Sequence, residues 1–164
     1  MNNALNNKGE IDILCVGEVL VDFIGHQEGV LISGTRDYHR YLGGSPTNVA
    51  MNSTRLGLNT IMVATVGNDG FGSYITERLT SVGINTSHVN VLDDKSTSVI
   101  FVSRSDGTPD FIPYRSADCC IYEEQISKEI LSNTKIFHTT CFALSKNPAQ
   151  KTILKKAKEA YDLG

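Results

Sequence analysis

The stretch GGSPTNVA, from Gly43 to Ala50, carries the clearest structural signal in the chain. Ser is common just before a helix, Pro is favoured in its first turn, and Gly is common just past its end. Because a proline follows Ser45 and Gly57 marks the other end, we predict a helix over residues 46–56 with Ser45 as its N-cap. Glycine has no Cβ, so the backbone at the two leading glycines can approach a ligand closely and offer its amides as donors.

Strand and helix signals alternate on both sides of this stretch. Ile11–Val16 is an apolar run that Gly17 ends, as in a buried strand of a parallel sheet, and the carboxyl end of such a strand is a natural place for a ligand. Residues 60–66 form a second β-rich run, and residues 71–82 are predicted to form a helix. Alternation of this kind is typical of an α/β fold.

The other segments add short strands, a hairpin and two further helices. In the last helix, capped by Asn147, we expect Ile153, Leu154, Ala157 and Tyr161 to share one apolar face. The hairpin interrupts the α/β alternation and is expected to form a separate flap. The predicted elements are short strands within 21–41, hairpin strands 97–103 and 110–115 around the turn 105–108, a helix over 122–131, a strand over 136–140, and a helix from 148 to 163.

Composition and charge narrow the class of protein. The chain has 164 residues, of which 40% are hydrophobic and 20% are charged, and its formal net charge is −3. This balance is typical of one ordinary globular domain, and it gives no electrostatic reason to expect nucleic acid or an anionic membrane as a partner. A small neutral or weakly charged ligand fits better.

The cysteines, the histidines and the first ten residues add expectations of their own. No CxxC pair and no metal-ligand spacing of histidines is present, so we do not expect a metal bound through Cys and His. Cys15 and Cys141 lie in apolar runs, where a reduced thiol packs as a small buried hydrophobe. The polar first ten residues lack the apolar segment of a signal peptide, and no run reaches transmembrane length, so we expect a cytoplasmic location.

The stretch at residues 43–50, followed by Gly57 and Gly67, resembles the amino-terminal signature of the PfkB family of ribokinase-like carbohydrate kinases. The segment VGNDGFG at residues 66–72 is similar to the family's VGDDxFG segment, with Asn68 in place of the first Asp, and the resemblance extends over nearly the whole chain from Ile11 onward. It implies a three-layer α/β/α fold with a small β-sheet lid. It also implies that residues 1–164 are the amino-terminal part of one domain, without the carboxy-terminal part that binds ATP and carries catalysis.

Four residues in this region have the chemistry of a polyol site. Asp22 can accept hydrogen bonds from two neighbouring hydroxyls, and the Asn48 amide can both donate and accept. Gly43 and Gly44 would bring the backbone close to the same ligand. Taken singly, each residue also has an ordinary role, as a turn glycine, a solvent-facing helix residue or a cap. The joint spacing and the family signature favour a sugar site.

The resemblance also implies a lid made of segments 22–42 and 97–115, which closes over the sugar and pairs with a second subunit, so we expect a homodimer. Ile100 and Val102 would then face the sugar ring, although packing within the lid is an equal alternative. Arg115 lies in YRSAD, which resembles a segment of fructokinase-like and sugar-acid-kinase members. A guanidinium can hold a carboxylate bidentately, so Arg115 either binds a sugar acid or only supports the lid.

Three departures from the family pattern bear on function. Ribokinase-type members carry a sugar-binding Glu after the strand that corresponds to residues 136–140, where this chain reads FHTTC; this argues against ribose, with His138 as a polar substitute. The family's G-A-G-D and NxxE segments are missing, and no Walker A motif replaces them. ATP and Mg²⁺ are therefore expected for the full-length parent only, and no catalytic, cofactor or metal residue is assigned to this chain.

The sequence thus predicts the sugar-binding part of an ATP-dependent carbohydrate kinase acting on fructose or a related ketose. One alternative is a kinase of a sugar acid such as 2-keto-3-deoxygluconate. Another is a non-catalytic sugar-binding or dimerising module. A Rossmann nucleotide-binding domain is disfavoured because no GxGxxG follows the first strand.

Overall fold

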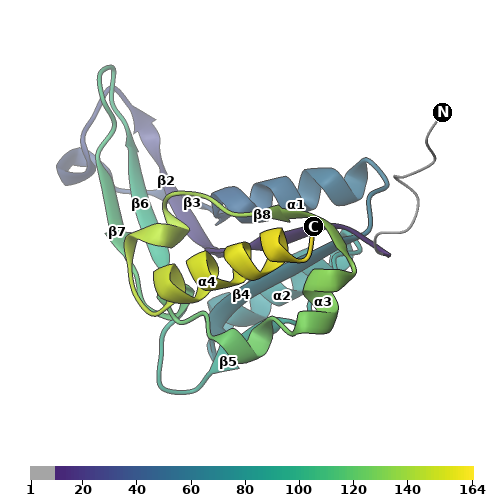
Figure 1. Cartoon of the computed structure of the whole chain (residues 1–164). Helices are drawn as coiled ribbons and strands as arrows, with labels where there is room; N and C mark the ends of the chain where they lie inside the picture. The colour runs from purple at the N-terminus through teal and green to yellow at the C-terminus, as the bar shows by residue number, and fades with distance from the viewer. Residues whose placement is uncertain (1–9) are drawn as a thin grey trace.

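The protein is organised around two sheets in the structure, a computed structural model that describes residues 10–164. The main sheet is entirely parallel, with strand order β5-β4-β1-β8, and helices lie on both of its faces (Figure 1). This confirms the predicted three-layer α/β fold. The elements of this body are β1 (Ile11–Val16), β4 (Thr60–Gly67), β5 (Val89–Leu92) and β8 (Thr134–His138), with α1 (Ser45–Arg55), α2 (Gly70–Ser81), α3 (Lys128–Ser132) and α4 (Ala149–Asp162).

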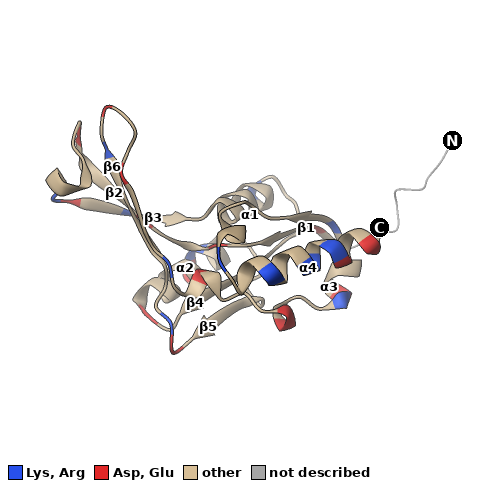
Figure 2. Cartoon of the chain, turned by 60° about the vertical axis from the view of Figure 1, so that its left-hand side comes forward, with Lys and Arg blue, Asp and Glu red and all other residues tan. Residues whose placement is uncertain are grey.

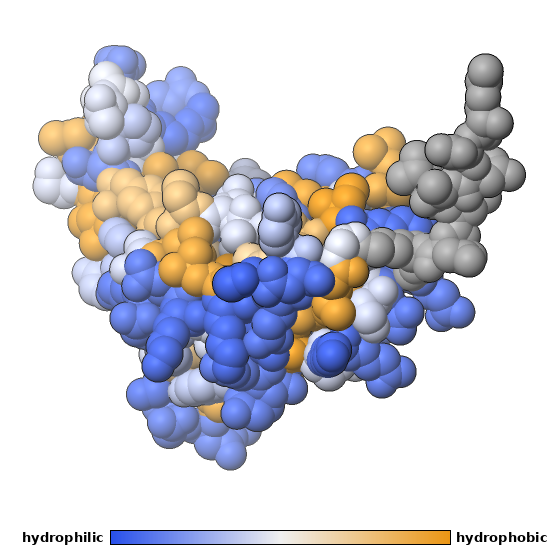
Figure 3. Space-filling view, in the orientation of Figure 1, coloured by the Kyte–Doolittle hydropathy of each residue, from blue (hydrophilic) through white to orange (hydrophobic). Residues whose placement is uncertain are grey.

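The second sheet stands out from the body as an arm (Figures 1 and 2). Its strand order is β3-β2-β6-β7, and the antiparallel pairing of β6 with β7 confirms the predicted hairpin. We call it the lid sheet; its strands overlap the sequence segments 22–42 and 97–115. Hydrophobic residues gather where the arm joins the body (Figure 3). Its strands are β2 (Leu20–Glu28), β3 (Tyr38–Gly43), β6 (Val99–Arg104) and β7 (Phe111–Tyr114).

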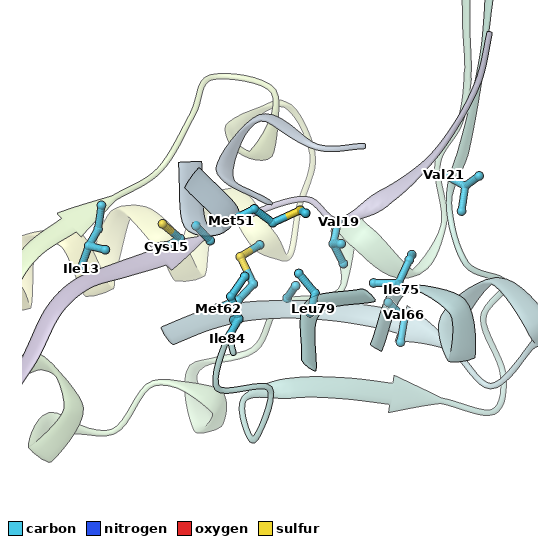
Figure 4. Packing of buried hydrophobic residues seen from close by; sticks show 12 residues of the cluster. Ile13, Cys15, Val19, Val21, Met51, Met62, Val66, Ile75, Leu79 and Ile84 are labelled. Carbon is cyan, nitrogen blue, oxygen red and sulfur yellow. The ribbon is translucent and has the colours of Figure 1, made fainter. Parts of the chain in front are cut away.

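Two hydrophobic cores hold the main sheet between its helices. On one face, Met51 of α1 and Ile75 and Leu79 of α2 pack against β1 and β4 (Figure 4). On the other face, Ile153 of α4 packs against Leu14 and the segment that leads to α3. Because β1 and β4 are covered on both faces, nearly every residue in them is buried, which explains their continuous apolar sequence.

The single helix predicted over residues 122–131 is wrong. The segment forms a short 3₁₀ turn, Glu123–Gln125, and then α3, which begins anew after Ser127. Gln125 is buried, and its side-chain amide donates to the Ala64 carbonyl of β4 at 2.9 Å while its oxygen accepts from the Tyr122 N–H. These tertiary contacts hold the turn in place of a continuous helix.

Smaller differences concern helix ends and faces. Gly44, not Ser45, is the N-cap of α1, and Pro148, not Asn147, is the N-cap of α4. The buried stripe of α4 starts at Ala149 and includes Ile153, whereas the predicted face members Leu154 and Tyr161 are 55% and 85% exposed. One residue step turns a helix by about 100°, which is enough to move Leu154 off the buried face.

Cys15 is buried as expected, but Cys141 is exposed. The last strand, β8, covers Thr134–His138, two residues earlier than predicted.

Candidate functional site

Close contacts require glycine at both positions before α1. A Cβ on Gly43 would collide with the carboxylate of Asp22 and lie 2.7 Å from Cδ1 of Leu20. Gly44 has φ +107°, and a Cβ there would collide with the backbone carbonyl of Glu18. The glycines therefore let the start of α1 pack against β2 and the segment that precedes it.

Asp22 lies within β2, opposite Tyr41 of β3 and Ile100 of β6. The strand begins two residues earlier, at Leu20. The carboxyl group is partly enclosed, and this burial raises its pKa. Asp22 thus presents a carboxylate from the base of the lid sheet toward the start of α1.

A cavity of about 350 Å³ lies where the lid sheet meets α1. It brings together four of the predicted site residues, Asp22, Gly44, Asn48 and Ile100, and Gly43 lies directly against Asp22. Val102 is not among the residues that line it. The full lining is Glu18, Leu20, Asp22, Gly44, Ser45, Asn48, Ile100, Phe111 and Phe142.

Glu18 is the site residue that the sequence reasoning missed. It is 2% exposed, and its Oε1 accepts the backbone N–H of Ser45 at 3.0 Å. The N–H of the first residue of α1 is therefore bound within the protein, and its acceptor is the side chain of a residue distant in sequence. The Thr140 hydroxyl, just past β8, lies 3.2 Å from Oε2. Burial raises the pKa of Glu18, and the nearby Asp118 adds to this.

Arg115 lies outside this cavity, and its guanidinium is already engaged. Its Nε and Nη2 donate to Oδ2 of Asp118 at 2.8 and 2.6 Å, and Nη1 donates to the Phe142 carbonyl at 3.1 Å. The side chains of Arg115 and Asp118 are 3% and 0% exposed. The guanidinium also covers the ring of Phe142 at 4.1 Å. Arg115 therefore touches the site only through Phe142, which it holds against the cavity.

A larger cavity of about 690 Å³ lies between the start of α2 and the lid sheet, but it suits a polar ligand less well. Asp69, its main acidic group, caps α2 by accepting the N–H groups of Phe71 and Gly72. The same carboxylate accepts the N–H and hydroxyl of Thr97. These hydrogen bonds lower the pKa of Asp69 although its burial acts in the opposite direction. The Asp69 carboxylate is thus engaged within the protein, as is the guanidinium of Arg115, which also lines this larger cavity.

His138, suggested as a substitute for a missing carboxylate, is the last residue of β8 and does not line the 350 Å³ cavity. Its Nε2 and the Oγ1 of Thr139 are buried without a hydrogen-bond partner. Residues 10–164 contain no group of three or more His, Cys, Asp or Glu side chains that could hold a metal. No helix in this part of the chain is long and apolar enough to cross a membrane.

Comparison with known proteins identifies relatives and solved structures with the same fold. An ATP-dependent 6-phosphofructokinase of Thermoanaerobacterium thermosaccharolyticum is 40% identical over 142 residues, covering 87% of this chain and 44% of that protein. A solved fructokinase of Halothermothrix orenii superposes with a TM-score of 0.89 at 36% identity, covering 94% of this chain and 55% of that one. An uncharacterised sugar kinase of Pyrococcus horikoshii, solved with ATP, gives a TM-score of 0.84 at 31% identity, covering 90% and 49%.

The chain spans about half the length of the curated relatives that it matches. The sequence profile described as pfkB family carbohydrate kinase matches residues 10–163, which is almost all of the chain that the structure describes. The resemblance seen in the stretch at residues 43–50 is therefore confirmed, and the chain belongs to the pfkB family of carbohydrate kinases.

Proposed function

We propose that this chain forms the sugar-binding part of an ATP-dependent carbohydrate kinase, which transfers the γ-phosphoryl group of ATP to a hydroxyl of fructose or a related ketose. The observation that carries the proposal is the 350 Å³ cavity, which brings the Asp22 carboxylate and the Asn48 amide around one space of the size of a small ligand. A carboxylate that accepts and an amide that does both match hydroxyls, which donate and accept.

In this proposal the lid sheet closes over the bound sugar. Ile100 and Phe111 of the lid sheet line the cavity together with Ser45 and Asn48 of the body. Closure would exclude water from the transferring phosphoryl group and would prevent hydrolysis of ATP. No residue of this chain is assigned to the transfer step itself; its described residues bind and enclose the sugar.

The engagement of Arg115 with Asp118 favours a ketose over a sugar acid, because its Nε and Nη2 already donate to Asp118 Oδ2.

A ketose that carries a phosphate is a second candidate, since one relative is named a 6-phosphofructokinase. A neighbouring cavity of about 420 Å³ shares Asn48 and carries Arg40 and Arg78, which could hold a phosphate. Calorimetric titration of the full-length protein with fructose, fructose 6-phosphate and 2-keto-3-deoxygluconate separates the three.

Replacing Asp22 with asparagine should weaken sugar binding by about tenfold to a hundredfold, because a hydrogen bond to a charged acceptor is lost. Since burial raises the pKa of Asp22, the fold disfavours its ionised form, and the neutral variant should be at least as stable at pH 7. Sugar affinity of the unmodified protein should fall as the pH is lowered through this raised pKa, and Asp22→Asn should reduce that dependence. Titration calorimetry across pH and thermal unfolding measure both effects.

The matched control is Asp106→Asn, on the exposed turn of the lid hairpin, which should leave affinity unchanged. Unchanged affinity in Asp22→Asn would remove Asp22 from the site. A full-length protein that binds none of the three sugars, or that binds sugar but transfers no phosphoryl group from ATP, would overturn the kinase proposal.

We also propose that the face of the lid sheet opposite Asp22, which carries Phe23 and Phe101, joins two copies of the protein. Phe23 stacks on Phe101 with ring centroids 5.1 Å apart, and Tyr114 packs against Phe101 while 61% of it remains exposed. A partly exposed aromatic face on a sheet whose edge strands, β3 and β7, are open suits a symmetric pairing. Tyr114→Lys should convert a dimer into a monomer by light scattering. Tyr161→Lys, at an 85% exposed position on α4, should not. A dimer that survives Tyr114→Lys would contradict the pairing.

A further inference from the structure

Glu18 occupies an unusual position for a carboxylate. It lies between β1 and β2, where the chain leaves the main sheet for the lid sheet, and it is almost completely buried. It nevertheless lines the same 350 Å³ cavity as Asp22 and Asn48. A buried carboxylate that is not fully paired is costly, so its surroundings have to supply hydrogen-bond donors.

The donors within the protein do not use the whole carboxylate. Oε1 accepts the Ser45 N–H at 3.0 Å, and the Thr140 hydroxyl lies 3.3 Å from Oε1 and 3.2 Å from Oε2. The residue's own backbone N–H is a third donor. A carboxylate has about four acceptor positions, so one remains for a donor from the cavity.

A structural role alone does not require a charge at this position. The start of α1 could be capped by a neutral Ser, Thr or Asn oxygen, which would not carry the cost of burying a carboxylate. The main chain of Glu18 already holds the start of α1 in place, because its carbonyl accepts the Thr47 hydroxyl at 3.0 Å. What a carboxylate adds over these contacts is a strong acceptor on a residue that lines the cavity.

The charges around the cavity indicate the kind of ligand. Its lining contains two carboxylates, Glu18 and Asp22, and no Lys, Arg or His among the described residues. Such a space attracts groups that donate hydrogen bonds and repels anions. The ligand part enclosed here therefore has to donate hydrogen bonds, as polyol hydroxyls do, and a phosphate or carboxylate on the same molecule has to lie outside the cavity.

We propose that Glu18 is a specificity-determining residue that accepts a hydrogen bond from one hydroxyl of the bound polyol, while Asp22 accepts from another. This inference rests on the proposed function and adds a second carboxylate to the sugar site. In this proposal the two acids reach the ligand from different parts of the protein: Asp22 lies in the lid sheet, and Glu18 lies just after the end of β1.

The test compares Glu18→Gln with Thr140→Val in the full-length protein. Glutamine keeps an oxygen for the Ser45 N–H but replaces one acceptor with a donor, whereas valine removes the Thr140 contact and keeps the carboxylate. Titration calorimetry with the best-bound ketose should show about a tenfold or greater rise in Kd for Glu18→Gln and less than a threefold rise for Thr140→Val. Thermal unfolding checks that both variants remain folded.

A panel of monodeoxy ketoses identifies the hydroxyl. For one analogue, the Kd of Glu18→Gln should equal that of the unmodified protein, because the partner hydroxyl is already missing; every other analogue should retain the loss. An equal loss for all analogues, equal losses in both variants, or no loss in Glu18→Gln would each overturn the role of Glu18 while leaving the sugar site in place. Failure of the unmodified protein to bind any ketose would overturn the proposed function together with this inference.

Discussion

Replacing Asp118 with alanine is expected to lower the free energy of unfolding by about 3–5 kcal/mol, because it leaves a buried guanidinium without its counter-charge. The side chains of Arg115 and Asp118 are 3% and 0% exposed, so water cannot take the place of the lost carboxylate. Chemical denaturation at neutral pH, with an unchanged dependence on denaturant concentration, measures the effect. Sugar affinity should fall as well, since Arg115 holds Phe142 against the cavity.

The control for this prediction is a Lys–Asp ion pair on the surface. Lys158 and Asp162 on α4 lie 2.8 Å apart but are 75% and 55% exposed, and Asp162→Ala should cost less than about 0.5 kcal/mol. Replacing both Arg115 and Asp118 with apolar residues of similar volume should recover most of the loss, because no charge is then left buried. If Asp118→Ala were no more harmful than Asp162→Ala, the buried pair would not stabilise the fold.

Replacing Gly44 with alanine should both destabilise the protein and abolish sugar binding. The backbone conformation with φ +107° costs a non-glycine residue about 1–3 kcal/mol. The added Cβ would also collide with the Glu18 carbonyl, so α1 has to move away from the cavity that it lines. Denaturation and sugar titration on one sample measure the two losses together.

Substitutions at two other glycines separate the cost of the backbone conformation from the effect of the collision with Glu18. Gly57 has φ +90° but no atom within 4 Å of an added Cβ, so Gly57→Ala should show the backbone cost alone and leave sugar affinity unchanged. Gly70 begins α2 with open space around it and no such φ, so Gly70→Ala should be close to neutral. Sugar affinity in Gly44→Ala that matched Gly57→Ala would show that the contact with Glu18 does not shape the cavity.

Much of the fold could be predicted from local sequence signals, such as the residues at helix ends and the apolar runs of strands. Pro and Gly mark both ends of α1, and continuous apolar runs mark β1 and β4 because these strands are covered on both faces. The family signature in the same stretch then indicated a sugar site near Asp22 and Asn48. The arrangement of these residues around one cavity agrees with that hypothesis, although their contacts with sugar remain a prediction.

The parts that could not be predicted depend on contacts between distant residues. Glu18 meets Ser45 across 27 positions and Thr140 across 122, so no local pattern indicates that it caps α1. The break before α3 depends on Gln125 reaching β4, again through a tertiary hydrogen bond. Arg115 looked available for a substrate because its partner Asp118, only three residues away, gives no sign in the sequence of being buried with it.

Two parts of the protein, the lid sheet and the start of α1, line the cavity. Asp22 and Ile100 belong to the lid sheet, whereas Ser45 and Asn48 belong to the start of α1. If the lid sheet closes as proposed, a molecule that touches both walls would bind the closed arrangement more tightly and so favour it, because a ligand shifts an equilibrium by its differential affinity for the two states. A shorter molecule that touches only one wall would lack this effect. Closure would then depend on the length of the ligand.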